Sequence, residues 1–127
     1  MNKQKAPIRT AIYARVDAGK QGDECAAQIQ RLKEFIEKDT HLILAGVYAD
    51  DGLPANAPRP EWEKLLADCD AGQYDAILAM SLSRLERSPF KLVQITDRLD
   101  NANVRIITLK EDCGLLPLIL GSVIADG

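Results

Sequence analysis

The stretch IRTAIYARV, residues 8–16, is dominated by β-branched and apolar residues, and the polar, glycine-containing run DAGKQG, residues 17–22, follows it directly. This composition predicts a buried strand that ends in a loop. A helix is predicted next, because Asp23 is a suitable N-cap and apolar residues recur at helical spacing from Cys25 to Ile36. The first part of the chain is therefore expected to form a strand, a loop and a helix.

The same alternation continues outward from this unit. Further strands are predicted at residues 42–48, 75–82 and 104–109, and further helices from Pro60 to Gly72 and, after a Ser88–Pro89 cap, from Phe90 to Leu99. The intervening run DDGLPANAPRP holds three prolines and is predicted to be loop. Strands that alternate with helices predict parallel βαβ units. We therefore expect an α/β fold: an open, mainly parallel sheet of at least four strands with helices on both faces, ending in a short apolar helix.

Composition limits the class of protein. The 127 residues, 46% of them hydrophobic, suffice for one domain with its own core. Lys and Arg number 16 against 19 Asp and Glu, so any contact with nucleic acid must be local. No secretory signal or bilayer-spanning apolar run is visible, and we expect a cytoplasmic protein without a membrane partner. Cys25, Cys69 and Cys113 match no disulfide or zinc pattern and are expected to be buried free thiols.

Charged and polar residues follow the predicted strands, and the carboxyl ends of parallel strands share the edge at which open sheets bind ligands. These residues are Arg15, Asp17, Asp50, Asp51, Ser81, Ser83, Arg84, Arg87 and Lys110 to Asp112. Arg59 could reach the same edge, which would bring four arginines together. Arginine forks match phosphate oxygens and stabilise the charge that develops in phosphoryl transfer. Alternatively, Arg84 and Arg87 lie one turn apart on a solvated face and pair with Glu86 and the nearby aspartates.

Read together, these segments resemble the catalytic domain of the serine site-specific recombinases, the resolvase/invertase family. AIYARV at residues 11–16 is similar to the family's Tyr-X-Arg-Val-Ser start, and Gln21 and Gln28 fall at its glutamine positions. YADDGLPANAPRPEWEKLL at residues 48–66 resembles its Asp-X-Gly-X-Ser-Gly loop and the Arg-Pro helix start that follows. SLSRLERS at residues 81–88 resembles its Asp-Arg-Leu-X-Arg motif. The resemblance covers nearly the whole chain in the family's order.

The resemblance implies a function in DNA recombination and integration, as in mobile elements. In this family a serine attacks the DNA phosphodiester and becomes joined to the 5′-phosphate, while arginines bind the non-bridging oxygens, and no metal or other cofactor is needed. The matching arginines here are Arg15, Arg59, Arg84 and Arg87. The implied partners are DNA and further copies of the chain, in a homodimer or higher oligomer, with no small-molecule substrate.

The expected nucleophile is absent from its matching position. Asp17 stands where the Tyr-X-Arg-Val-Ser motif has its serine, and Ser83 replaces the acidic residue before Arg84. A carboxylate that attacked phosphorus would form a high-energy mixed anhydride, and its charge would repel a phosphate at ~4 Å by about 4 kcal/mol. We therefore expect a domain degenerate for cleavage that acts in assembly or regulation. Asp17 would serve the arginines as an internal substitute for the phosphate.

Two alternatives remain open. The first is an active recombinase domain with another nucleophile. The other serines are Ser81, Ser83, Ser88 and Ser122. Of these, Ser83 lies beside an arginine, whereas Ser88 suits a helix cap. The second alternative is an unrelated receiver-like signalling module that holds Mg²⁺ at Asp50 and Asp51, since that ion prefers oxygen ligands.

The C-terminal segment favours self-association. Residues 115–124 contain more large apolar side chains than one helix face can bury on its own sheet, and exposed apolar patches mark interfaces. In the family, the corresponding helix forms the dimer and leads to a separate DNA-binding domain. We interpret residues 1–127 as a single resolvase-type catalytic domain with a flexible tail at 1–7, the start of an interface helix at 115–127 and no DNA-binding domain. The alternative is that the segment folds back onto the sheet edge.

Overall fold

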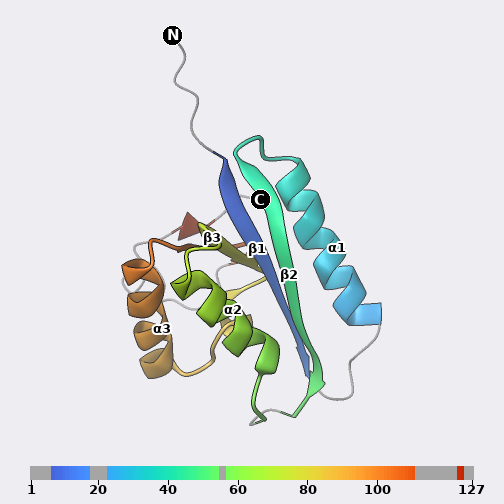
Figure 1. The fold of residues 1–127 in the computed structure, drawn as a ribbon. Coiled ribbons are helices and arrows are strands. Elements are labelled where there is room, and N and C mark those ends of the chain that lie inside the picture. Colours follow the sequence, from blue (N-terminus) through green and yellow to red (C-terminus); the bar gives the residue numbers. More distant parts are fainter. Residues whose placement is uncertain (1–6, 18–22, 55–56, 111–122, 125–127) are drawn as a thin grey trace.

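The computed structural model describes residues 7–17, 23–54, 57–110 and 123–124, which form a parallel sheet and the helices that cover it (Figure 1). In chain order the elements are β1 (Ile8–Asp17), α1 (Asp23–Glu37), β2 (Leu42–Leu53), α2 (Pro60–Asp70), β3 (Ala76–Ala79), the short 3₁₀ helix η1 (Leu82–Arg84), α3 (Pro89–Asn101), β4 (Arg105–Thr108) and β5 (Val123–Ile124). The sheet has the strand order β2-β1-β3-β4-β5, and every neighbouring pair is parallel. The predicted α/β class is confirmed.

β1 lies inside the sheet, paired with β2 on one side and β3 on the other. Its residues from Thr10 to Val16 are all buried. Ala11 and Tyr13 pack into the core formed with α2 and α3, whereas Ile12 packs into the core formed with α1. A strand covered on both faces needs apolar residues at successive positions, which explains the unbroken apolar run of residues 11–14 in this segment.

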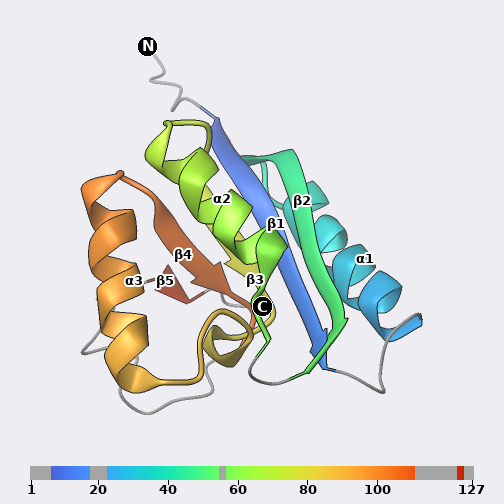
Figure 2. The same ribbon diagram turned by 60° about the horizontal axis from the view of Figure 1, so that its bottom comes forward.

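Helices cover both faces of the sheet, as predicted (Figures 1 and 2). On one face Leu32 and Ile36 of α1 pack with Ile12 and Leu78. On the other, α2 and α3 enclose the larger core, in which Trp62 is 2% exposed and its ring centre lies 4.9 Å from that of Tyr13. The result is a three-layer arrangement that leaves the strand ends uncovered by helix faces.

The boundaries of two strands differ from the prediction. β2 continues to Leu53, so residues 50–53, predicted to be loop, pair with the end of β1. The strand continues past Tyr48 because Gly52, at φ 79°, accommodates a register shift, and it ends before Pro54, which has no amide hydrogen to donate. β3 ends at Ala79, earlier than predicted, because the chain turns into η1 and buries Leu82 instead.

The helix predicted for the C-terminal segment is not present in its described part. Val123 and Ile124 form β5, which pairs in parallel with β4. Two β-branched residues suit a strand, and the open edge of β4 offers unpaired backbone groups. At these two residues the chain follows the alternative of folding back onto the sheet edge. Residues 111–122 and 125–127 lie outside the described residues, as does Cys113.

Several smaller predictions are confirmed. Cys25 and Cys69 are buried free thiols, and burial raises the pKa of the Cys69 thiol to about 12. Pro60 occupies the first turn of α2, and the Ser88 side chain accepts a hydrogen bond from the Lys91 amide at the start of α3. Within the parts of the chain that the structure describes, no helix is long and apolar enough to cross a membrane.

Gly46 leaves room for a buried tyrosine pair, which leads to a stability prediction. The hydroxyl groups of Tyr48 and Tyr74 lie 2.7 Å apart, and a Cβ at position 46 would overlap the Tyr74 hydroxyl and lie 3.0 Å from its Cζ. Gly46→Ala is therefore expected to lower the free energy of unfolding by about 1–3 kcal/mol, because Tyr74 is buried and a shift of its ring would disturb its hydrogen bond to Tyr48. Urea unfolding would measure the loss.

The double variant Gly46→Ala/Tyr74→Phe supplies the control. Removing the Tyr74 hydroxyl relieves the closest overlap, so the two substitutions together should cost less than the sum of the single losses. Additive losses would show that Gly46 is needed for a reason unrelated to Tyr74.

Candidate functional site

The carboxyl ends of β1 and β3 lie next to each other within the sheet, and the connection that leaves β1 leads to β2 on one side, whereas the connection that leaves β3 leads to β4 on the other. Open α/β sheets bind ligands at such a switch point. Figure 2 shows the arrowheads of β1 and β4 and the segment between β3 and α3 at the same end of the molecule. Five charged residues gather there, and we call them the arginine rim: Arg15, Asp17, Arg59, Arg84 and Arg87.

Arg15 is the buried member of the arginine rim, at 8% exposure. Its Nη2 donates to the Ser83 carbonyl oxygen at 3.0 Å, and its backbone amide donates to the Gln28 Oε1 at 3.2 Å. Its Nε has no hydrogen-bond partner among the described residues. Burial, followed by the positive charges of Arg87 and Arg59, lowers the Arg15 pKa. A buried cation with a donor to spare is a favourable place for an oxyanion.

Asp17 is paired with Arg87. Arg87 Nη2 donates to both carboxylate oxygens of Asp17, at 3.2 and 3.0 Å. This hydrogen bond lowers the pKa of Asp17, and the charges of Arg15 and Arg84 act in the same direction. The two side chains are 40% and 50% exposed, so the pair lies at the surface of the rim and solvent screens it.

The remaining two arginines approach the rim from different elements. Arg84 belongs to η1, where its amide donates to the Ser81 carbonyl at 3.2 Å. Arg59 directly precedes α2, and its Nη1 donates to the Leu85 carbonyl at 2.7 Å. The structure thus brings all four predicted arginines into one electrostatic neighbourhood. Gln28 also lies there, through its bond to Arg15, whereas Gln21 falls outside the described residues.

Asp50 has a role that the sequence did not reveal. It is 3% exposed, and Oδ2 accepts from the Tyr13 hydroxyl at 2.6 Å and from the Trp62 amide at 3.0 Å, while Oδ1 accepts from the Glu61 amide at 3.0 Å. Asp50 therefore caps the start of α2 from a neighbouring strand, since the N-cap residue Arg59 makes no side-chain cap. No spacing rule links a carboxylate to a helix that begins ten residues later.

The predicted serines differ in their surroundings. Ser81 Oγ and Ser83 Oγ lie 3.1 Å apart, Ser88 caps α3, and Ser122 lies outside the described residues. The single histidine, His41, precedes β2 at the opposite end of the sheet. Among the described residues no group of three His, Cys, Asp or Glu side chains could hold a metal ion. The oxygens of Asp50 are occupied by hydrogen-bond donors, which disfavours the predicted Mg²⁺ site.

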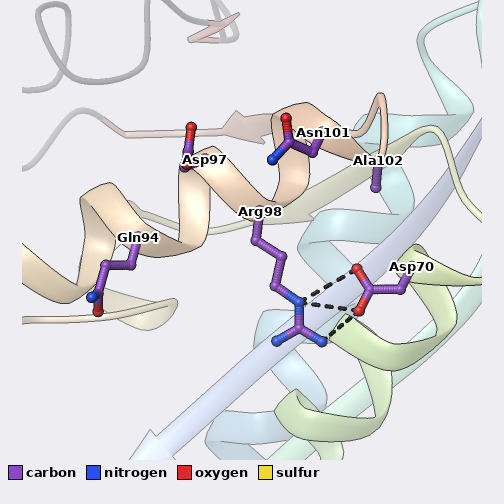
Figure 3. A pocket seen from close by; sticks show the side chains of 6 residues that line it. All are labelled: Asp70, Gln94, Asp97, Arg98, Asn101 and Ala102. Atoms are coloured by element: carbon purple, nitrogen blue, oxygen red, sulfur yellow. Dashed lines mark hydrogen bonds and ion pairs between the residues drawn. The ribbon is translucent and has the colours of Figure 1, made fainter.

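A separate hollow of about 430 Å³ lies between the C-terminal end of α2 and α3 (Figure 3). Its lining is polar, and Arg98 reaches across it to Asp70, with Nη2 at 2.6 Å from Oδ2. Helix C-termini face the amino ends of parallel strands, so this hollow is at the end of the sheet opposite the arginine rim. The ion pair spans it, and none of its lining residues belongs to the arginine rim.

Comparison with known proteins identifies relatives of this fold. Residues 10–116 match the family model described as Resolvase, N terminal domain. The C-terminal catalytic domain of ISC1926 TnpA, an IS607-like serine recombinase, is 25% identical with a TM-score of 0.70, over 80% of this chain and 68% of that one. The N-terminal catalytic domain of TP901-1 integrase is 28% identical with a TM-score of 0.65, over 79% and 75%.

A third solved structure shares the fold at lower identity. The first ORF in transposon ISC1904 from Sulfolobus solfataricus P2 is 21% identical with a TM-score of 0.68, over 84% of this chain and 70% of that one. No curated protein sequence matched the chain.

Proposed function

This chain belongs to the Resolvase N-terminal domain family, and from that premise we propose that it is a serine-recombinase-type domain that no longer cleaves DNA and acts in the assembly or regulation of recombination. The family membership makes the chain a resolvase-type domain of DNA recombination. It also makes the receiver-like alternative wrong. The loss of cleavage and the regulatory role are the parts that we propose.

The pairing of Asp17 with Arg87 carries this proposal. By its place in the AIYARVD motif, Asp17 corresponds to the family's nucleophilic serine. It supplies a carboxylate to the arginines that would otherwise receive the scissile phosphate. A phosphate held ~4 Å from that carboxylate would be repelled by about 4 kcal/mol at an effective dielectric constant of ~20.

The chemistry of a carboxylate also opposes strand exchange. Attack by Asp17 on phosphorus would produce an acyl phosphate, which is higher in energy than the phosphodiester that is broken. Rejoining would then no longer be a near-balanced exchange. Ser83 is the alternative nucleophile, because its carbonyl is bonded to Arg15 and it therefore lies beside the rim. No base of the usual kinds is adjacent to it in sequence.

The proposed partners are DNA and further copies of the chain. Arg15, Arg84 and Arg87 present guanidinium groups of the kind that bind phosphate oxygens, so we assign DNA backbone to the rim as a ligand that binds only weakly while Asp17 is present. Assembly with further copies of the chain, as a homodimer or higher oligomer, is the second part of the proposal, and no cofactor is assigned.

We expect no covalent protein–DNA adduct when this chain is incubated with candidate site DNA, because Asp17 cannot replace a serine. Asp17→Ser restores the hydroxyl among intact arginines and is the single change expected to produce an adduct. Denaturing gel electrophoresis followed by mass spectrometry of the linked peptide would measure both.

Two outcomes would contradict this account. An adduct of the unchanged chain that maps to Ser83, and that is lost in Ser83→Ala, would establish an active domain with another nucleophile. An adduct that hydroxylamine cleaves, leaving a hydroxamate on Asp17, would show that the carboxylate itself attacks. Arg15→Ala in the Asp17→Ser background is the matched control and should remove the adduct.

A further inference from the structure

Arg59 differs from the other arginines of the rim because its guanidinium is held by three groups of the protein. Nη1 donates to the Leu85 carbonyl at 2.7 Å, Nη2 donates to the Glu86 Oε1 at 3.3 Å, and the guanidinium carbon lies 5.4 Å from the centre of the Trp62 ring. The Arg59 and Glu86 side chains are only 15% and 17% exposed. Water therefore screens this ion pair less than it screens the pair between Arg87 and Asp17.

Glu86 uses its second oxygen as well. Oε2 accepts from the Ser88 amide at 3.1 Å, and Ser88 is the N-cap of α3. One carboxylate thus connects the residue that precedes α2 with the residue that precedes α3. The next residue, Arg87, pairs with Asp17. Glu86 and Arg87 are adjacent in the sequence and therefore bind two different charged residues of the arginine rim, Arg59 and Asp17.

The electrostatics of Arg15 show why a counter-charge is needed. The positive charges of Arg87 and Arg59 both lower the Arg15 pKa, which means that the three cations repel one another. Asp17 neutralises Arg87, and Glu86 neutralises Arg59. With both carboxylates in place, only Arg15 and Arg84 of the four rim arginines have no ion-pair carboxylate among the described residues.

We propose that Glu86 is a positioning residue that retains Arg59 against Leu85 and Trp62 and so withholds one guanidinium from an oxyanion at the arginine rim. This inference rests on the proposed function, since it assigns a regulation to the same anion site. Loss of the Glu86 charge frees Arg59 to turn toward the anion. Glu86 and Asp17 together neutralise two of the four rim arginines in the absence of an anion.

The test uses inorganic sulfate as the probe and Asp17→Ala as the background, because that variant leaves the anion site without its own carboxylate. Asp17→Ala/Glu86→Gln should bind sulfate about three- to tenfold more tightly than Asp17→Ala, the effect of one added charge at a partly exposed site. Glu63→Gln, on the exposed side of α2, makes the same charge change and should leave the affinity unaltered.

Trp62 provides a readout that a purely structural role of Glu86 would not move. It is the single tryptophan of the chain, and the Arg59 guanidinium lies over its ring. Sulfate should change the Trp62 emission in Asp17→Ala/Glu86→Gln, as Arg59 leaves the ring, and change it little in Asp17→Ala. Adding Arg59→Met to the double variant should abolish both the emission change and the gain in affinity.

An unchanged or weaker sulfate affinity in a folded Asp17→Ala/Glu86→Gln variant would overturn the inference. If that variant does not fold, Asp17→Ala/Glu86→Asp tests the inference instead. Its carboxylate is shorter by one methylene and cannot reach both Arg59 and Ser88, so its sulfate affinity should rise by less than that expected for Asp17→Ala/Glu86→Gln. Absence of sulfate binding by Asp17→Ala alone contradicts the proposed anion site. The inference about Glu86 is overturned as well only if the variants that combine Asp17→Ala with a Glu86 substitution also fail to bind sulfate.

Discussion

Asp50→Ala is expected to lower the free energy of unfolding by about 3 kcal/mol. The substitution leaves the amides of Glu61 and Trp62 without acceptors at the start of α2 and leaves the buried Tyr13 hydroxyl unpaired. Because Trp62 and Tyr13 belong to the same core, the loss acts on a helix end and on core packing together. Chemical unfolding would measure it.

The neighbouring residue supplies the control. Asp51→Ala removes the same charge from an exposed position and should change stability by less than about 0.5 kcal/mol. The stability loss of Asp50→Asn should lie between those of Asp50→Ala and Asp51→Ala, because the amide group retains one acceptor oxygen for the three donors. Equal stabilities of Asp50→Ala and Asp51→Ala would show that the cap to α2 contributes nothing.

The fold was predictable because its signals are local. The mostly apolar composition of residues 8–16 follows from burial on both faces, and the first-turn residue Pro60 and the N-cap Ser88 act within one turn of their helices. The end of β2 was not predictable, because residues 50–53 become a strand only through pairing with the last residues of β1. A partner strand can impose extended structure on a glycine-containing segment, and composition does not record the partner.

The sequence predicted which arginines come together in the arginine rim, but it did not predict the groups that they bind. The carboxyl ends of parallel strands share one edge of the sheet, so Arg15 and Arg84 are expected to lie near each other whichever groups they bind. Arg15 and Arg59 donate hydrogen bonds to the main-chain carbonyls of residues 83 and 85, next to the turn at η1. Every residue has a main-chain carbonyl, so the sequence does not indicate which ones these arginines reach. The sequence suggests Arg84 and Arg87 as partners of Glu86 on a solvated face, whereas the folded arrangement brings Glu86 into contact with Arg59.

Asp17→Ala is expected to make the protein responsive to sulfate. With the carboxylate gone, Arg15, Arg84 and Arg87 face a site that an anion can enter. Sulfate at about a hundred times its dissociation constant should then stabilise the folded state by roughly 2.7 kcal/mol. The ion pair itself is half exposed, so its loss should lower stability without sulfate by less than about 1 kcal/mol. Thermal unfolding with and without sulfate would measure both effects.

Asp70→Ala is the matched control for this result, because it frees Arg98 from an ion pair of similar exposure at the opposite end of the sheet. A single unpaired guanidinium on a surface should give little response to sulfate, whereas a cluster around the buried Arg15 should give a large one. If Asp17→Ala responds no more than Asp70→Ala or the unchanged chain, the carboxylate is not a substitute for a bound anion. The reason for expecting the rim to be closed to a phosphate would then be lost, and Asp17 would have to prevent cleavage by its chemistry alone.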